Sequence, residues 1–274
     1  TLDIDRFAAR IREQVGIKNR WLERIYGLAA LDVDEIVDEY VGYARRIAPM
    51  VGDVSLVINQ AIDAGKQVLC EGAQGTLLDL DHGAYPFVTS STPTAGGACV
   101  GLGIGPTKID HVLAIAKAYT TRVGAGPMPT ELLDDTGEHL VRVGQEYGTT
   151  TGRRRRAGWL DTVILRYSAR VNGLTQIALT KLDVLTGLDT LRICVAYRRG
   201  AARVEHFPGD GAILDECEPV YEEMPGWQDD ISGARTLAGL PPAAREYVQR
   251  IEALCRVPIR MISVGPERDQ TIIR

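Results

Sequence analysis

Residues 161–183, DTVILRYSARVNGLTQIALTKLD, decide the fold that we predict. Asp161 is a typical helix N-cap, apolar side chains then recur at helical spacing, and Gly173 provides the stop. Residues 176–179 follow as a short buried strand, which ends in the polar residues 180–183. A helix that returns the chain to a buried strand is the repeating unit of a parallel sheet.

Similar units lie on both sides of this stretch. Buried-type strands are expected at residues 67–70, 111–119 and 259–262, and each runs into a glycine-containing polar loop. We therefore expect an α/β fold with a mainly parallel sheet and covering helices. Ligands of such sheets bind beyond the carboxyl ends of the strands, so Glu71, Gln74 and Asp79 are placed to contact one. Turn and cap chemistry explains the same three residues about equally well.

The two ends of the chain differ in pattern. Residues 1–64 have helical periodicity, and we expect their apolar stripes to face a core. Residues 65–274 form the α/β portion, one continuous structural unit. Apolar residues alternate strictly over residues 191–197 and lead through a turn into residues 203–207, which predicts a hairpin at the margin of the sheet.

Composition and charge limit the function classes. The chain has 274 residues, 45% of them apolar and 24% charged, as in an ordinary globular protein. Its 31 basic and 36 acidic residues give a net charge of −5, which argues against a nucleic-acid footprint over the whole chain. The five cysteines are odd in number and lack a C-x-x-C pair, so the sequence favours a reducing cytoplasm over a disulfide framework or a zinc site.

The segment 148–156, GTTTGRRRR, is the strongest anion-binding signal. Glycines let backbone N–H groups approach a ligand, threonines add hydroxyl donors, and each guanidinium is a planar fork that fits carboxylate or phosphate. In an extended run the side chains alternate, so Arg153 and Arg155 face one side while Arg154 and Arg156 face the other. A solvated basic run or a nucleic-acid patch is the alternative interpretation.

A guanine-recognition signal lies at residues 180–183, TKLD. A carboxylate at Asp183 can accept hydrogen bonds from guanine N1–H and N2–H₂, a donor pair that adenine lacks, while the Lys181 stem lies along the ring. The loop 263–265 could offer backbone N–H groups to guanine O6. No G-x-x-x-x-G-K-[ST] motif occurs in the chain, and residues 101–106 lack the last glycine of a dinucleotide fingerprint.

Taken together, these motifs resemble those of the adenylosuccinate synthetase family over essentially the whole chain. The residues that carry the resemblance are 71–79 (EGAQGTLLD), 85–91 (YPFVTSS), 121–127 (TRVGAGP), 149–156 (TTTGRRRR), 180–183 (TKLD), 222–227 (EEMPGW) and 263–266 (SVGP). The resemblance implies a P-loop-NTPase-like fold and a cytoplasmic, homodimeric enzyme of AMP biosynthesis. It implies that IMP is joined to L-aspartate with GTP and Mg²⁺ through 6-phosphoryl-IMP, giving adenylosuccinate, GDP and phosphate.

The resemblance also implies roles for individual residues. It places IMP at Gln74, Thr89 and Arg153, with Gln74 also taking part in catalysis. It places the GTP phosphates at Arg155 and guanine at Lys181, Leu182, Asp183, Ser263, Val264 and Gly265. The aspartate-binding residues that it implies are Thr149, Thr150, Thr151, Gly152, Arg153, Arg154 and Arg155.

The family's N-terminal phosphate loop, with its catalytic aspartate, metal position and catalytic histidine, does not precede Thr1 in this sequence. The metal ligands are therefore not expected in this chain, and we expect the chain alone to be inactive. The alternatives are a non-catalytic purine-nucleotide-binding module and a nucleic-acid-binding protein that uses the arginine run.

Overall fold

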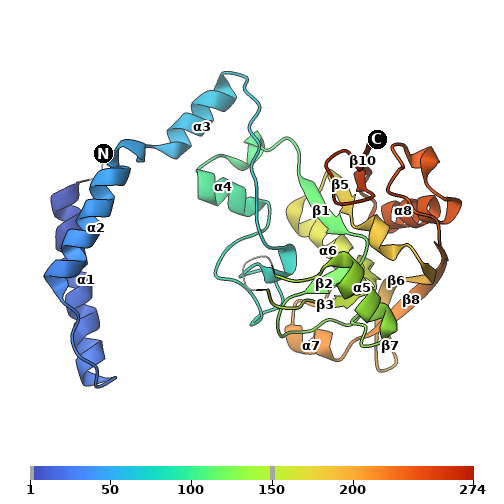
Figure 1. The fold of residues 1–274 in the computed structure, drawn as a ribbon, viewed down its shortest axis with the longest axis horizontal. Coiled ribbons are helices and arrows are strands. Elements are labelled where there is room, and N and C mark those ends of the chain that lie inside the picture. The colour runs from blue at the N-terminus through green and yellow to red at the C-terminus, as the bar shows by residue number, and fades with distance from the viewer. Residues whose placement is uncertain (1–2, 149–151) are drawn as a thin grey trace. The chain divides into compact units, whose positions relative to one another are not determined.

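The computed structural model describes residues 3–148 and 152–274 and divides the chain into two compact units, residues 1–68 and 69–274 (Figure 1). The first unit contains three α-helices and a 3₁₀ turn: α1 (Ile4–Arg24), α2 (Val33–Ile47), η1 (Ala48–Met50) and α3 (Val54–Asp63). Asp3, Asp32 and Asp53 cap these α-helices by accepting backbone N–H groups of the first turn.

Helices α1 and α2 pair with each other. The Asn19 side chain exchanges two hydrogen bonds with the backbone of Leu31, at 2.8 and 2.9 Å, and closes the turn between them. Only Val37 and Ala44 are buried among the described residues of these three helices. Our prediction that the apolar stripes form a core is therefore wrong in this structure, because two paired helices can bury only one narrow seam.

The second unit is built around a four-stranded sheet with the order β1-β5-β9-β10. Strand β5 pairs in parallel with β1 on one side and β9 on the other, while β10 is antiparallel to β9. This confirms the α/β class and the mainly parallel character of the main sheet. The strands of this sheet are β1 (Leu113–Lys117), β5 (Gln176–Thr180), β9 (Ile259–Ser263) and β10 (Thr271–Ile273).

A second sheet is centred on the long strand β6 (Leu188–Arg199). Strand β4 (Leu160–Asp161) pairs with it in parallel, and β7 (Ala202–Val204) and β8 (Glu218–Trp227) pair with it antiparallel. The predicted hairpin between β6 and β7 is confirmed, but its predicted position at the sheet margin is wrong. Strand β8 pairs along most of β6, so β6 is central and its Leu191, Ile193 and Tyr197 are fully buried.

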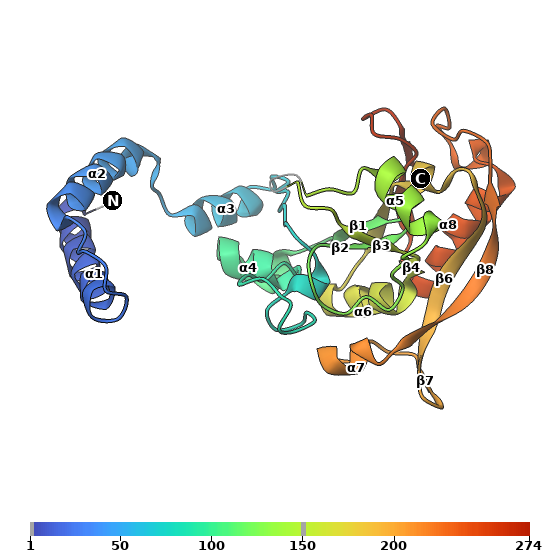
Figure 2. The same ribbon diagram turned by 60° about the horizontal axis from the view of Figure 1, so that its bottom comes forward.

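The remaining elements connect and cover these sheets. Strands β2 (Thr120–Arg122) and β3 (Arg156–Gly158) form an antiparallel pair, and in Figure 2 α5 (Asp135–Gly144) and α6 (Thr162–Asn172) lie on opposite sides of the β1–β3 region. The largest core cluster draws on β1, β5, β9 and α8 (Pro242–Cys255). The other helical segments are η2 (Thr76–Leu78), α4 (Gly96–Leu102), η3 (Pro106–Lys108), η4 (Leu182–Leu185), α7 (Gly211–Asp215) and η5 (Leu237–Gly239).

The predicted strand at residues 67–70 is absent from this structure. Residues 65–72 have no regular secondary structure, and Leu69 is 92% exposed. A strand requires a neighbour that pairs with its backbone, and in the described part of the chain no strand pairs with this segment.

Candidate functional site

The carboxyl ends of three parallel strands meet at one edge of the main sheet. Lys117 is aligned with Thr180 at the ends of β1 and β5, and Leu179 of β5 is aligned with Ile262 of β9. The loops that follow these strands therefore begin side by side. This is the edge at which open α/β sheets bind ligands.

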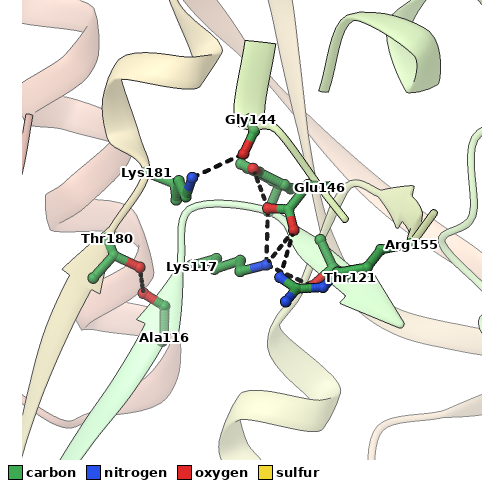
Figure 3. A network of polar contacts seen from close by, with 9 residues as sticks. Ala116, Lys117, Thr121, Gly144, Glu146, Arg155, Thr180 and Lys181 are labelled. Carbon is green, nitrogen blue, oxygen red and sulfur yellow. Dashed lines mark hydrogen bonds and ion pairs between the residues drawn. The ribbon is translucent and has the colours of Figure 1, made fainter. Parts of the chain in front are cut away.

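The predicted guanine-recognition residues lie in two of these neighbouring loops. Lys181 has a left-handed backbone, with φ at +64°, and its Nζ donates to the Gly144 carbonyl oxygen at 2.8 Å (Figure 3). The Asp183 side chain is partly buried; burial raises its pKa, and the nearby Lys181 ammonium opposes that shift. In the described part of the chain, no other side chain donates a hydrogen bond to the Asp183 carboxylate. The backbone N–H of Asp183 itself contacts the carboxylate, and the remaining lone pairs of the two oxygens are available to a ligand.

Leu182 and Val264, also predicted to bind guanine, bury their side chains completely. Only their backbone groups can therefore face a ligand. Ser263 donates its hydroxyl to the Gly265 carbonyl at 2.8 Å, which fixes a tight turn after β9. An added Cβ at Gly265 would lie 2.2 Å from the end of the Gln270 side chain, so a larger residue in this turn would require that flexible side chain to move.

A buried carboxylate, Glu146, lies two residues beyond the end of α5 and gathers three donors (Figure 3). Lys117 Nζ lies 2.7 and 2.8 Å from its two oxygens, the Tyr119 hydroxyl donates at 2.6 Å, and Arg155 donates at 2.8 Å. Lys117 also donates to the Thr121 hydroxyl at 2.8 Å. The network links the end of β1, the turn after α5 and the arginine run.

The electrostatics of this network follow from its burial. The Glu146 side chain is 1% exposed, and burial alone would raise its pKa. Hydrogen bonds from Lys117, Tyr119 and Arg155 outweigh that cost, so the pKa of Glu146 is lowered and its anion is favoured. Burial lowers the pKa of Lys117, although its bonds to Glu146 oppose that shift.

Arg154 and Arg156, like Arg155, bind carboxylates of the chain itself. Arg154 pairs with the exposed Glu138 on α5. Arg156 forms a two-pronged pair with Glu131, at 2.5 and 2.7 Å, and also donates to the carbonyl oxygens of Gly124 and Gly126. Neighbouring side chains of the run therefore engage different elements.

The rest of the predicted aspartate loop is only partly described. Arg153 accepts a backbone hydrogen bond from Gly148 at 2.7 Å, and Gly152 has a left-handed backbone, with φ at +62°. The predicted residues Thr149, Thr150 and Thr151 lie outside the described residues.

The structure brings together the two predicted IMP residues, Gln74 and Thr89. The Gln74 amide donates to the Thr89 hydroxyl at 3.1 Å and accepts from Ser91 at 2.7 Å, and its backbone φ is +68°. Arg122 on β2 links this loop to the two-stranded β2–β3 sheet, because its side chain donates to the Phe87 carbonyl at 3.1 Å. Among the described residues, no hydrogen bond joins Gln74 or Thr89 to the guanine loops.

Asp79, proposed above as a ligand contact or a cap, acts as a cap here. Its buried carboxylate accepts the Thr94 hydroxyl at 2.8 Å and the backbone N–H groups of Asp81 and His82. Burial opposes ionisation, but these hydrogen bonds prevail and lower the pKa of Asp79.

Sequence reasoning missed Lys117, Tyr119 and Glu146. One signal was available: Lys117 is the single charged residue in the apolar stretch LAIAKAY, and a charge in a buried strand requires a partner. The identity of that partner depends on tertiary structure, because Glu146 lies 29 residues away in the chain.

Two kinds of feature are absent from the described part of the chain, a metal-binding group and a membrane-spanning helix. No group of three or more His, Cys, Asp or Glu side chains there is arranged to hold a metal ion. The resemblance placed the Mg²⁺ ligands in the family's N-terminal phosphate loop, and we derive no chemical step through that metal. None of the described helices has the length and apolar character needed to cross a bilayer.

Comparison with known proteins places these features in a family context. The family model described as adenylosuccinate synthetase matches residues 1–272. The chain is 57% identical over 272 residues to an adenylosuccinate synthetase of Moorella thermoacetica and 58% identical to one of Carboxydothermus hydrogenoformans. Each match covers 99% of this chain and 64% of the relative, so the chain spans about two thirds of the relatives' length.

A solved structure agrees with these matches. The fully ligated adenylosuccinate synthetase of Plasmodium falciparum superimposes with a TM-score of 0.92 at 37% identity, over 99% of this chain and 64% of that protein. The family assignment rests on a family match over nearly the whole chain, on relatives above 50% identity and on a shared fold. This chain belongs to the adenylosuccinate synthetase family.

Proposed function

We propose that this chain recognises GTP, IMP and L-aspartate for an enzyme that ligates aspartate to IMP. The products are adenylosuccinate, GDP and phosphate, formed through 6-phosphoryl-IMP. One observation carries the proposal: the Asp183 carboxylate, which no other described side chain contacts by a hydrogen bond, and Lys181 lie beside partly buried cations held by the buried Glu146, at the ligand-binding edge of the sheet. The proposal includes the cytoplasmic homodimer that the family resemblance implies.

The charges at this edge suit a nucleotide. Lys117, Arg155 and Lys181 bring three positive charges to the strand ends, against two negative charges from Glu146 and Asp183. An electropositive site of this kind favours phosphate oxygens, and the Arg155 guanidinium is a planar donor fork for them. Asp183 would then select guanine by accepting N1–H and N2–H₂.

The other substrates are assigned to the polar loops of the same unit. Gln74 and Thr89, which are hydrogen-bonded to each other, would hold IMP, and the loop 149–155 would hold aspartate. In the reaction, Gln74 would orient the purine while Arg153 and Arg155 neutralise charge. Phosphoryl transfer depends mainly on such positioning and charge stabilisation.

The second candidate is a non-catalytic purine-nucleotide-binding module. It is favoured by the lack of a G-x-x-x-x-G-K-[ST] motif in the sequence. We predict that the 274-residue chain binds GTP in preference to ATP but does not turn over. Its cations neutralise phosphate charge without supplying the phosphate-cradling loop that transfer requires.

The test mixes purified chain with GTP, Mg²⁺, IMP and aspartate and follows GDP and adenylosuccinate. Thermal unfolding with each nucleotide measures binding in parallel, since a ligand of the native state raises its stability. Stabilisation by single-stranded nucleic acid but by no nucleotide would reject the proposed function. Turnover at ordinary enzyme rates would reject the predicted inactivity.

A further inference from the structure

Glu146 holds Arg155 through both its buried carboxylate and its backbone carbonyl. Its Oε2 accepts from the Arg155 guanidinium at 2.8 Å, and its backbone carbonyl accepts from the Arg155 backbone N–H, also at 2.8 Å. The Arg155 side chain is 27% exposed, so it is held by Glu146 without being fully buried. No other carboxylate among the described residues forms an ion pair with Arg155.

Glu146 is in turn fixed by groups that leave it little freedom. Lys117 at the end of β1 and Tyr119 in the connection to β2 hold its oxygens, and the Tyr119 side chain is buried. Gln145, just before it, has a left-handed backbone with φ at +49°. A Cβ added to Gly144 would lie 2.2 Å from the Tyr119 hydroxyl, so the backbone of this turn packs directly against the Tyr119 side chain.

The same turn also holds the guanine-recognition loop. Lys181 Nζ donates to the Gly144 carbonyl at 2.8 Å, two residues before Glu146 (Figure 3). The short segment 144–146 therefore ties Lys181, a proposed base contact, to Arg155, a proposed phosphate contact. Their separation is set by one rigid turn and not by two independent loops.

We propose that Glu146 is a positioning residue that fixes the Arg155 guanidinium relative to the base-recognition loop, so that affinity for the nucleotide's phosphates depends on it. The proposal rests on the proposed GTP-binding function and deepens it. Glu146 itself does not touch the nucleotide, because its oxygens are already taken by Lys117, Tyr119 and Arg155. A merely structural carboxylate would affect stability alone.

The test compares GTP with guanosine, which has the base but no phosphates. Dissociation constants of both are measured for the 274-residue chain and for Glu146→Gln. Gln keeps the shape but removes the charge that holds Arg155. We expect the preference for GTP over guanosine to fall by about tenfold to a hundredfold, the range for a lost hydrogen bond to a charged group. Guanosine affinity itself should stay nearly constant.

Glu131→Gln is the matched control. Glu131 binds the neighbouring Arg156 through two hydrogen bonds, so its loss breaks a similar Arg–Glu pair in the same run. We expect this variant to lose stability in urea unfolding and to keep the parent's preference for GTP over guanosine. An equal loss of preference in Glu131→Gln would overturn the proposal, because any broken pair would then have the same effect.

A double-mutant cycle tests whether Glu146 acts through Arg155. Arg155→Gln and the Glu146→Gln/Arg155→Gln double variant should show the same GTP preference, since the positioned group is already absent. Glu146→Gln leaves the Lys117 ammonium without its ion-pair partner and could fail to fold for that reason. In that case the double variant Glu146→Gln/Lys117→Met, which removes the unpaired cation as well, is measured instead. Lys117→Met alone is its control. An unchanged GTP preference in a folded Glu146 variant overturns the proposal. A parent chain that binds neither ligand overturns the proposed function itself.

Discussion

Replacing Asp183 with asparagine is the most direct test of guanine recognition. The Asp183 carboxylate is partly buried beside Lys181, and no other described side chain donates a hydrogen bond to it. Guanine would give it two hydrogen bonds in a site that excludes part of the solvent. A bidentate contact to a base edge is worth about 1–3 kcal/mol, so Asp183→Asn should weaken GTP binding about 5-fold to 150-fold.

The same change should alter the order of preference among bases. Asparagine keeps one acceptor oxygen but presents an NH₂ group where guanine has its own NH₂, whereas xanthine has a carbonyl oxygen there. We therefore expect Asp183→Asn to bind XTP better than GTP, while ATP binding stays weak in both proteins. Calorimetric titration of the three nucleotides measures these affinities.

A matched control separates base recognition from a general change of charge. Asp189 on β6 is exposed and accepts from Gln228 at 2.9 Å, so Asp189→Asn removes one negative charge without altering the strand-end site. We expect it to leave the GTP preference unchanged. Equal affinity of the parent for GTP and ATP, or an equal loss for all nucleotides in Asp183→Asn, would refute the reasoning.

Two further predictions concern the arginine run and a buried acid. Arg153→Leu and Arg155→Leu should strongly weaken the binding of GTP and IMP in titrations, because the alternation argument places these two side chains on the ligand-facing side. Arg154→Leu and Arg156→Leu, on the other side and paired with Glu138 and Glu131, should change it about twofold or less; equal losses at all four positions would contradict the alternation argument. Burial raises the pKa of Asp161 to about 6 despite hydrogen bonds from a tyrosine and two backbone N–H groups, so the folded carboxyl keeps its proton between about pH 4 and 6 while the unfolded one loses it. As pH rises through this window, the parent's free energy of unfolding should therefore fall relative to that of Asp161→Asn, by about 3 kcal/mol at most. Urea unfolding of both proteins from pH 4 to 7 measures this, and a constant difference between their free energies of unfolding would exclude it.

The parts of the fold that the sequence predicted are those with strong local signals. The helix capped by Asp161 and stopped by Gly173, and the apolar strand that follows, form as expected. Their order along the chain also predicted that the loops 180–183 and 263–265 would meet at one sheet edge. That inference needed only the parallel pairing of short buried strands, which does not depend on distant side chains.

The parts that failed depend on partners far away in the chain. Strand β8 contains Glu222, Glu223, Pro225 and Gly226, residue types that disfavour strands, yet it pairs along β6 because tertiary packing outweighs local propensity. Residues 67–70 show the opposite case, since their apolar pattern is strand-like but no described strand pairs with them. Local pattern alone cannot distinguish these two situations.

The backbone explains why the site's geometry was also hidden from the sequence. Four described residues other than glycine have positive φ, and three of them, Gln74, Gln145 and Lys181, lie in the proposed IMP loop, the turn before Glu146 and the guanine loop. A left-handed conformation costs such residues roughly 1–2 kcal/mol each, and asparagine or glycine would lower that cost. Side-chain bonds offset it at two of them: Gln74 is held by Thr89, and Lys181 by the Gly144 carbonyl. Long polar side chains at strained positions indicate that their direction matters more than local stability, because a glycine would relieve the strain but could not form these bonds.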